Sequence, residues 1–168
     1  EIMGAVKKAK PSFELTDQVA DIVESNVRDV FLSMFNLEAK TGEHRFERDH
    51  VDQGDVSGTV GMVQEEMEGT LTVSFPRQTI FNILRDIYGR DFDDVDQTVK
   101  EGVGELTNVI YSMIKRGLND LGYEFKMAIP DIVVGENHQI FKVQVGSTLV
   151  LPFQLGDEKF EVSITIRS

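Results

Sequence analysis

The sequence predicts a single α+β domain in which helices pack on a largely antiparallel sheet. Apolar residues recur at steps of three and four in three segments, which is typical of amphipathic helices. Between and after these segments apolar and polar residues alternate, which is typical of strands with one buried face. Glycine, proline and aspartate stand where the segments meet, and the 168 residues suffice for one sizeable core.

Composition and charge exclude several classes of function. The 29 acidic and 17 basic residues give a formal net charge of −12, which would repel a nucleic-acid backbone. The chain has no cysteine and no run of 18 apolar residues, so we expect a cytoplasmic protein that does not insert into a membrane. Glu1–Lys10 lacks the apolar block of a signal peptide. We expect residues 1–12 to form a flexible end and residues 13–168 to form the domain.

The first helix is predicted at Asp17–Phe35, with Thr16 as its N-cap. The polar stretch Leu37–Gly54 is predicted to be an irregular or partly paired connection. The helix prediction rests on the apolar stripe Val19, Ile22, Val23, Val27, Val30, Phe31 and Met34.

A β-hairpin is predicted to follow, because apolar and small residues alternate from Val56 onward. We place its turn near Glu68 and Gly69. The alternating positions are Val56, Gly58, Val60 and Met62 before the turn and Leu71 and Val73 after it.

The second helix is predicted to carry Pro76 in its first turn and to end at Gly89. Its apolar stripe is Ile80, Phe81, Leu84 and Ile87. Four aspartates follow, at positions 91, 93, 94 and 96, but they do not fit an EF-hand loop, because Val95 and Asp96 stand where that loop needs an oxygen ligand and glycine. We interpret them as carboxylates that complement a helix dipole, with Asp94 and Gln97 spaced as a capping box.

The third helix is predicted at Val95–Leu121, ending at Gly122. Its core-facing stripe is Val99, Val103, Leu106, Ile110, Met113 and Gly117. A polar stripe is displaced by two residues, or about 200°, and should face solvent; it consists of Glu101, Glu105, Asn108, Ser112, Lys115 and Asn119.

Gly102 and Gly104 lie in the middle of this helix, beside Glu105, and each costs roughly 1 kcal/mol relative to alanine. Close approach by another protein would explain them. Close packing within this chain would explain them equally well.

The rest of the chain is predicted to be β. Thr148–Phe153 should pair with Phe160–Ile166 across a turn at Gly156 and Asp157. Gly146 and Ser147 are predicted to form another turn, after a strand at Ile140–Val145. Each half of the chain thus begins with a long helix and continues into strands, a weak internal two-fold repeat.

The segment Glu101-Gly-Val-Gly-Glu-Leu-Thr-Asn108, with Pro130 and Asp131–Gly135 further on, resembles the CheX branch of the CheC, CheX and FliY chemotaxis phosphatases. That family's motif is Asp or Ser, three residues, Glu, two residues, Asn, and then a more distant proline. The stretch Gly69–Pro76 adds support, and the resemblance extends from about Phe13 to Ile166. It implies a CheC/CheX-like fold.

Two departures from the family pattern have consequences. Position 101 is glutamate, where the family has a shorter aspartate or serine. The first helix reads Glu24-Ser-Asn-Val27 and lacks asparagine at the matching place, so we expect one site per chain, as in CheX, whereas CheC carries two.

The resemblance implies a phosphatase that hydrolyses the aspartyl phosphate of a CheY-type response regulator. It assigns catalysis to Asn108 and Glu105 and contacts with the partner to Glu101, Gly102, Gly104 and Ser112. Mg²⁺ is expected on the receiver, and no cofactor on this chain. The resemblance also implies a homodimer formed through sheet edges, with Phe160–Ile166 as the candidate edge strand if it lies outermost.

Other chemistry has weaker support in the sequence. His44, His50 and His138 are scattered, and we interpret them as ordinary surface or loop histidines and expect no metal site. Neither a Gly-x-Ser-x-Gly elbow nor a phosphate-binding loop occurs. The alternative to catalysis is a receiver-binding or flagellar-switch-type docking module, and the presence of both Glu105 and Asn108 favours catalysis.

Overall fold

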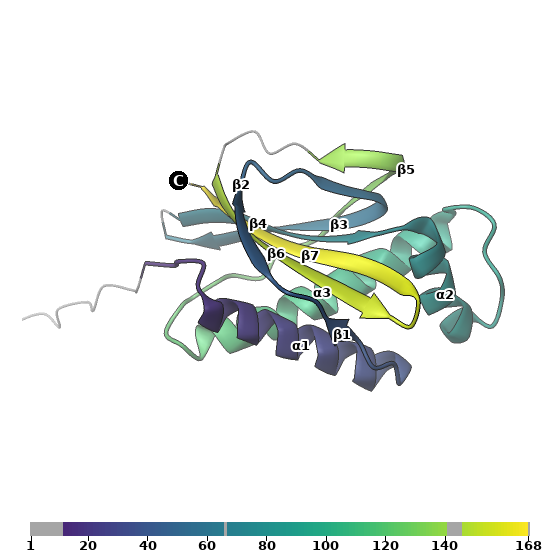
Figure 1. Cartoon of the computed structure of the whole chain (residues 1–168), viewed down its shortest axis with the longest axis horizontal. Coiled ribbons are helices and arrows are strands. Elements are labelled where there is room, and N and C mark those ends of the chain that lie inside the picture. Colours follow the sequence, from purple (N-terminus) through teal and green to yellow (C-terminus); the bar gives the residue numbers. More distant parts are fainter. Residues whose placement is uncertain (1–11, 66, 141–145, 168) are drawn as a thin grey trace, which may run out of the picture.

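In a computed structural model of the chain, the structure describes residues 12–65, 67–140 and 146–167, as one antiparallel sheet with three helices (Figure 1). The helices are α1 (Asp17–Phe35), α2 (Arg77–Tyr88) and α3 (Gln97–Asn119). The strands are β1 (Lys40–Thr41), β2 (Arg45–Arg48), β3 (Asp52–Gln64), β4 (Met67–Phe75), β5 (Asp131–Ile140), β6 (Gly146–Leu155) and β7 (Glu158–Arg167).

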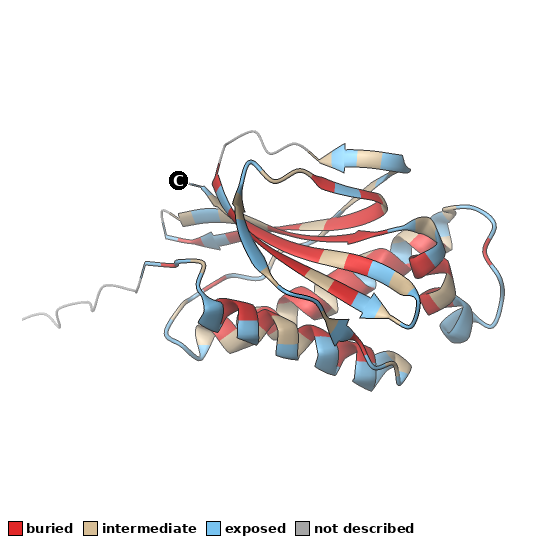
Figure 2. Ribbon diagram, in the orientation of Figure 1, coloured by how far each residue is buried: buried red, intermediate tan, exposed pale blue. Residues whose placement is uncertain are grey.

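The sheet has the strand order β1-β6-β7-β4-β3-β5, with β2 also paired to β6. All of these pairs are antiparallel. In Figure 1 α1 and α3 run side by side beneath the sheet, and α2 lies at one end of it. The buried residues concentrate between these layers (Figure 2). The predicted fold class is therefore confirmed, and none of the described helices is long and apolar enough to span a membrane.

Helix α1 has the predicted bounds because both of its ends are capped. The Oγ1 atom of Thr16 accepts a hydrogen bond from the backbone N–H of Val19 at 3.2 Å. Asn36 ends the helix in the left-handed conformation, with φ at 53°. The predicted apolar stripe holds as far as Phe31, but Met34 is exposed.

The hairpin β3–β4 forms with a different turn from the predicted one. Strand β3 begins at Asp52, four residues before Val56, and ends at Gln64, so the turn precedes Met67. Gly69 lies inside β4, where it pairs with Ile166 of β7. A Cβ on Gly69 would lie 2.8 Å from the carbonyl oxygen of Thr165, so the close approach of a neighbouring strand explains this glycine.

The ends of α2 and α3 correct three details of the predictions. Pro76 is the N-cap of α2 rather than a residue of its first turn. Helix α3 begins after Asp96, whose Oδ1 accepts a hydrogen bond from the N–H of Val99 at 3.0 Å, so the capping box of Asp94 and Gln97 is wrong. At its other end the helix stops at Asn119, and the positive φ of Gly122 belongs to the turn that follows.

The predicted C-terminal hairpin is confirmed, with Phe153 opposite Phe160. Gly146 and Ser147, predicted to form a turn, are the first residues of β6, because they pair with Arg167 and Ile166. Of the strand predicted at Ile140–Val145, residues 141–145 lie outside the described residues.

Strand β7 lies between β4 and β6, so the prediction that Phe160–Ile166 is an edge strand is wrong; alternation fits a central strand as well as an edge. The homodimer stays a prediction.

Candidate active site on the third helix

The predicted site residues lie in one row along α3. Glu101 and Glu105 are exposed, and Asn108 and Ser112 are half-buried. Glu105 and Asn108 are three residues apart, so their side chains lie next to each other on the helix surface. One turn before them, Glu101 accepts a hydrogen bond from the side-chain amide of Gln97 at 3.3 Å.

The opposite side of the same helical turn is pressed against the sheet at Thr107. This side chain is fully buried, and its hydroxyl donates to the carbonyl oxygen of Val103 at 2.7 Å. A Cβ on Gly58 of β3 would lie 2.0 Å from Thr107 Oγ1, so only glycine permits this approach of helix and strand. Because Thr107 faces the sheet, Glu105, about 200° around the helix, points away from the sheet, and Asn108, about 100° around, lies half-buried at the flank beside it.

Strand β5 brings the proline of the motif close to the same turn of α3. Ile132 pairs with Gly58 in the sheet, and Pro130 directly precedes β5. The side chain of Ile132 lies 3.7 Å from the position that a Cβ on Gly104 would take. The two parts of the sequence motif are therefore neighbours in space.

The two helical glycines have different explanations. A Cβ on Gly102 would lie 2.8 Å from a methyl carbon of Leu84, so packing against α2 accounts for this glycine. At Gly104 the nearest atom would be at 3.7 Å, an ordinary van der Waals distance. Gly102 is therefore a packing residue, whereas no close contact within the described residues requires glycine at position 104.

The connection from α3 to β5 is fixed by side-chain hydrogen bonds. Tyr111 donates to the carbonyl oxygen of Lys126 at 2.6 Å, and burial raises the pKa of Tyr111 to about 12, so the phenol remains a donor. Asn119 both accepts from and donates to the backbone of Phe125. Beyond these bonds Met127 and Ile129 are 66% and 90% exposed, directly before Pro130.

Comparison with known proteins decides the family. Residues 56–154 match the sequence profile of the family described as Chemotaxis phosphatase CheX. This chain belongs to the CheX family. The matched segment begins within β3, ends within β6 and includes the whole of α3 with its motif.

Individual relatives span nearly the whole chain. CheY-P phosphatase CheX of Thermotoga maritima is 22% identical over 153 residues, which are 90% of this chain and 97% of the relative. A CheC-like superfamily protein from Shewanella sp. PV-4 is 31% identical, with a TM-score of 0.83 over 92% of this chain and 100% of that one. CheX of Borrelia burgdorferi, solved as a complex with CheY, BeF₃ and Mg²⁺, is 25% identical, with a TM-score of 0.72 over 94% and 100% of the two chains.

Helix α1 is built differently at the positions that would match the CheX motif. Glu24 lies 3.3 Å from the Nδ1 atom of His44, and Val27 is fully buried. The residue in the place of asparagine thus faces the core. The number of sites per chain stays a prediction.

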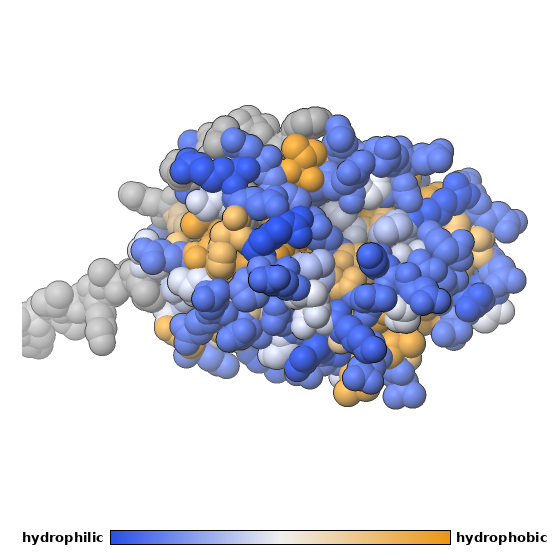
Figure 3. Space-filling view, viewed as in Figure 1, coloured by the Kyte–Doolittle hydropathy of each residue, from blue (hydrophilic) through white to orange (hydrophobic). Residues whose placement is uncertain are grey.

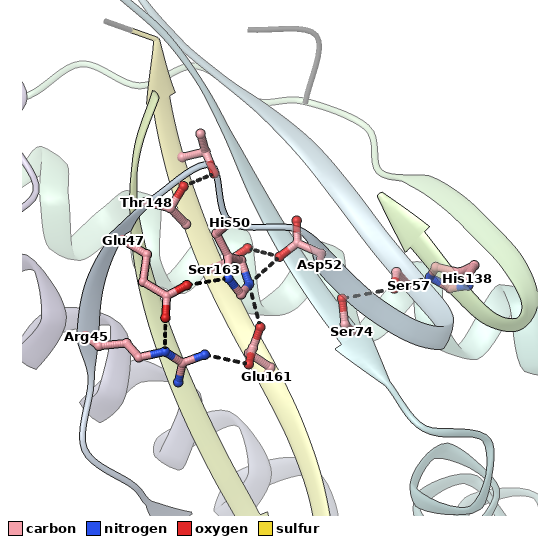
Figure 4. A network of polar contacts seen from close by, with 11 residues as sticks. Arg45, Glu47, His50, Asp52, Ser57, Ser74, His138, Thr148, Glu161 and Ser163 are labelled. Carbon is pink, nitrogen blue, oxygen red and sulfur yellow. Dashed lines mark hydrogen bonds and ion pairs between the residues drawn. The ribbon is translucent and has the colours of Figure 1, made fainter. Parts of the chain in front are cut away.

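His44 and His50 lie in loops, as predicted, and His138 lies in β5, but the side chains of all three histidines have polar partners. His44 bonds to Asp17, and His138 bonds to the buried hydroxyl of Ser57 at 2.8 Å. The side chain of His50 is only 10% exposed and is surrounded by carboxylates (Figure 4). Hydrogen bonds to Asp52, Glu161 and Glu47 outweigh the effect of burial and raise the pKa of His50 to about 10. Sequence spacing could not reveal this cluster, because Glu161 is 111 residues away.

Proposed function

We propose that this chain hydrolyses the aspartyl phosphate of a CheY-type response regulator in chemotaxis, with Asn108 and Glu105 as its working residues. The observation that supports this most directly is their placement. They lie side by side on the outer surface of a helical turn whose inner side is held against the sheet by Thr107 and Gly58. A site on a helix that is held rigidly in this way can meet the active site of another protein without being deformed.

The reaction needs a water molecule in line with the phosphorus–oxygen bond that breaks. Catalysis of phosphoryl transfer comes mostly from positioning and charge compensation, and not from covalent participation of the protein. The amide of Asn108 can both donate and accept hydrogen bonds, so it can orient this water. In this proposal Asn108 is the catalytic residue in direct contact with the attacking water.

Glu105 has a different role in this proposal. Its exposed carboxylate forms a charge-assisted pair with a lysine of the receiver, which sets the register of docking. Mg²⁺ is assigned to the receiver together with the phosphoaspartate, so this chain needs no metal for the step. The relatives from T. maritima and B. burgdorferi, one named CheY-P phosphatase and the other solved with CheY, BeF₃ and Mg²⁺, support the choice of partner. We place the reaction in the cytoplasm, because a chain without cysteine suits a reducing compartment.

The test follows loss of labelled phosphate from a phosphorylated CheY-type receiver, with binding measured in parallel. Asn108→Ala is expected to lower the rate constant by roughly 100-fold or more, because the water loses its orientation, and to leave binding intact. Glu105→Ala is expected to weaken binding as well as turnover. Asn26→Ala on α1 is the matched control, since it removes an asparagine amide from the helix that lacks the motif, and it should retain full activity.

The same experiment separates catalysis from docking. If wild type, Asn108→Ala and buffer give one rate of phosphate loss although the chain binds the receiver, the chain is a docking module. If Asn108→Ala is as active as wild type and both exceed buffer, the chain is a phosphatase with a different catalytic residue.

A further inference from the structure

The sheet face opposite the helices carries a compact group of metal-ligand side chains, His50, Asp52 and Glu161 (Figure 4). Each offers one ligand atom, and these three atoms lie within 4.8 Å of one another. We propose that they form a binding site for a divalent transition-metal ion, with Zn²⁺ as the best-suited ion. This site is separate from the motif on α3.

The distances suit one small ion. The Nε2 atom of His50 lies 2.9 Å from Glu161 Oε1 and 3.5 Å from Asp52 Oδ1. Zn–N and Zn–O bonds of about 2.0–2.2 Å in tetrahedral geometry place neighbouring ligand atoms roughly 3.4 Å apart. To surround one ion, the imidazole nitrogen has to move about 0.5 Å away from Glu161, and the two carboxylate oxygens, which lie within 4.8 Å of each other, have to settle at that same spacing.

The ligands are also oriented by a second layer of hydrogen bonds. The Nδ1 atom of His50 lies 2.8 Å from Glu47 Oε2, and this bond directs Nε2 toward Asp52 and Glu161. Such a pairing of carboxylate and histidine is the usual support of a metal-bound imidazole. Asp52, which is 1% exposed, accepts a hydrogen bond from the hydroxyl of Ser163, and Arg45 lies 3.7 Å from the second oxygen of Glu161.

An ion can reach the group from solvent. His50 and Glu161 line a cavity of about 410 Å³, together with Arg45, Asp55 and Asn137. This opening leaves room for water in the fourth coordination position. In the chain without metal, a proton on His50 Nε2 pairs with the two carboxylates, so the ion replaces that proton.

Charge and donor type indicate the class of ion. One imidazole and two carboxylates are typical ligands of Zn²⁺, whereas Ca²⁺ and Mg²⁺ prefer sites made only of oxygen. The carboxylates of Glu47, Asp52 and Glu161 carry three negative charges, and Arg45 carries one positive charge. With His50 neutral, the group therefore has a net charge of −2. A divalent cation balances these charges.

The test is a calorimetric titration of Zn²⁺ into the full chain, prepared without a histidine tag and stripped with a chelator. We expect one Zn²⁺ per chain, and Co²⁺ in its place should give the visible absorption of a tetrahedral site. His50→Gln should abolish both signals. Glu47→Gln should weaken binding roughly 10-fold to 100-fold, because it removes only the supporting bond.

The matched control is His138→Gln, which removes another histidine of the same sheet face and should bind as wild type does. Metal-free melting curves show whether each variant folds, and if His50→Gln does not, Glu161→Gln is used for the same comparison. Absence of stoichiometric binding to wild type, or equal binding by wild type and the ligand variants, would overturn the proposal. Asn108→Ala should bind Zn²⁺ normally, so this result is independent of the phosphatase test.

Discussion

The two faces of the sheet are built from opposite kinds of residue, and yet both are buried. The face that packs on the helices is apolar and joins α1, α2 and α3 in one hydrophobic cluster. The other face is rich in hydroxyl groups, and Val150, although fully buried, lies outside that cluster. Its buried polar residues are Asp52, Ser57, Thr72, Ser74, Thr148, Ser163 and Thr165.

This second face is buried because its polar groups find partners across strands. Thr148 and Thr165 bond to each other at 2.9 Å, and Ser57 and Ser74 do so at 3.0 Å. The chain around His50 crosses this face and adds the carboxylate network (Figure 4). The side of the molecule shown in Figure 3 is largely hydrophilic, with separate apolar groups. One sheet can therefore bury an apolar face for stability and a polar face that holds charged side chains in fixed positions.

The largest change in the free energy of unfolding is expected from a substitution at the close contact between β3 and α3 on the apolar face. Gly58→Ala puts a methyl group 2.0 Å from Thr107 Oγ1, and such overpacking costs about 1–3 kcal/mol of unfolding free energy. Since Thr107 holds the helical turn that carries Glu105 and Asn108 against the sheet, phosphatase activity should fall as well. Denaturant unfolding and phosphate release measure the two effects.

Gly61→Ala on the same strand is the control for this change. A Cβ at Gly61 has nothing within 4 Å, so stability and activity should be unchanged or slightly higher. Equal destabilisation by both substitutions would show that the close contact with α3 is unimportant.

A substitution on the polar face should change the free energy of unfolding by a comparable or somewhat smaller amount. Ser163→Ala removes a donor to the buried Asp52 carboxylate, which costs about 1–3 kcal/mol when a buried polar group loses its partner. The exposed Ser147 of the neighbouring strand is the control, and Ser147→Ala should change the unfolding free energy by less than about 0.5 kcal/mol. Thermal unfolding of both variants at one pH gives the comparison. Similar values for the two would mean that the polar face contributes little.

Alanine substitutions at Gly104 and Gly102 should change the unfolding free energy by smaller amounts and in opposite directions. Gly104→Ala has room for its methyl group and should stabilise the chain by up to about 1 kcal/mol, but it should weaken receiver binding if the receiver approaches there. Gly102→Ala meets Leu84 at 2.8 Å and should lose stability instead. Unfolding and receiver binding are measured for both. Unchanged binding by Gly104→Ala would remove this glycine from the docking surface.

The smallest effect concerns His44, which joins the segment before β2 to α1. Its hydrogen bond to Asp17 is the main cause that raises its pKa above 6.5, with Glu24 contributing and burial opposing. A raised folded pKa means that this stabilisation is fully present below pH 6.5 and is lost as pH rises through the folded value. Titration of the His44 ring by NMR should show the raised pKa, and Asp17→Asn should lower it. An unchanged pKa in Asp17→Asn would rule out that hydrogen bond as the cause.

The sequence by itself determined the helices, the two hairpins and the row of Glu101, Glu105, Asn108 and Ser112. These features follow from local rules, because a period of 3.6 or 2 decides which side of an element each residue occupies. Caps such as Thr16 and Gly89 follow from the same local chemistry. The family motif could be found in the sequence for that reason, since all of it except Pro130 lies on one helix.

Only the tertiary structure decided which elements pack against each side of a helix or strand. Alternation in Phe160–Ile166 fits a central strand and an edge strand equally well, and strand order made it central. The same alternation could not show that Ser163 and Thr165 would be buried, or that His50 would meet Glu161. Those contacts join residues far apart in the chain, so their energies depend on the complete fold and leave no periodic trace in the sequence.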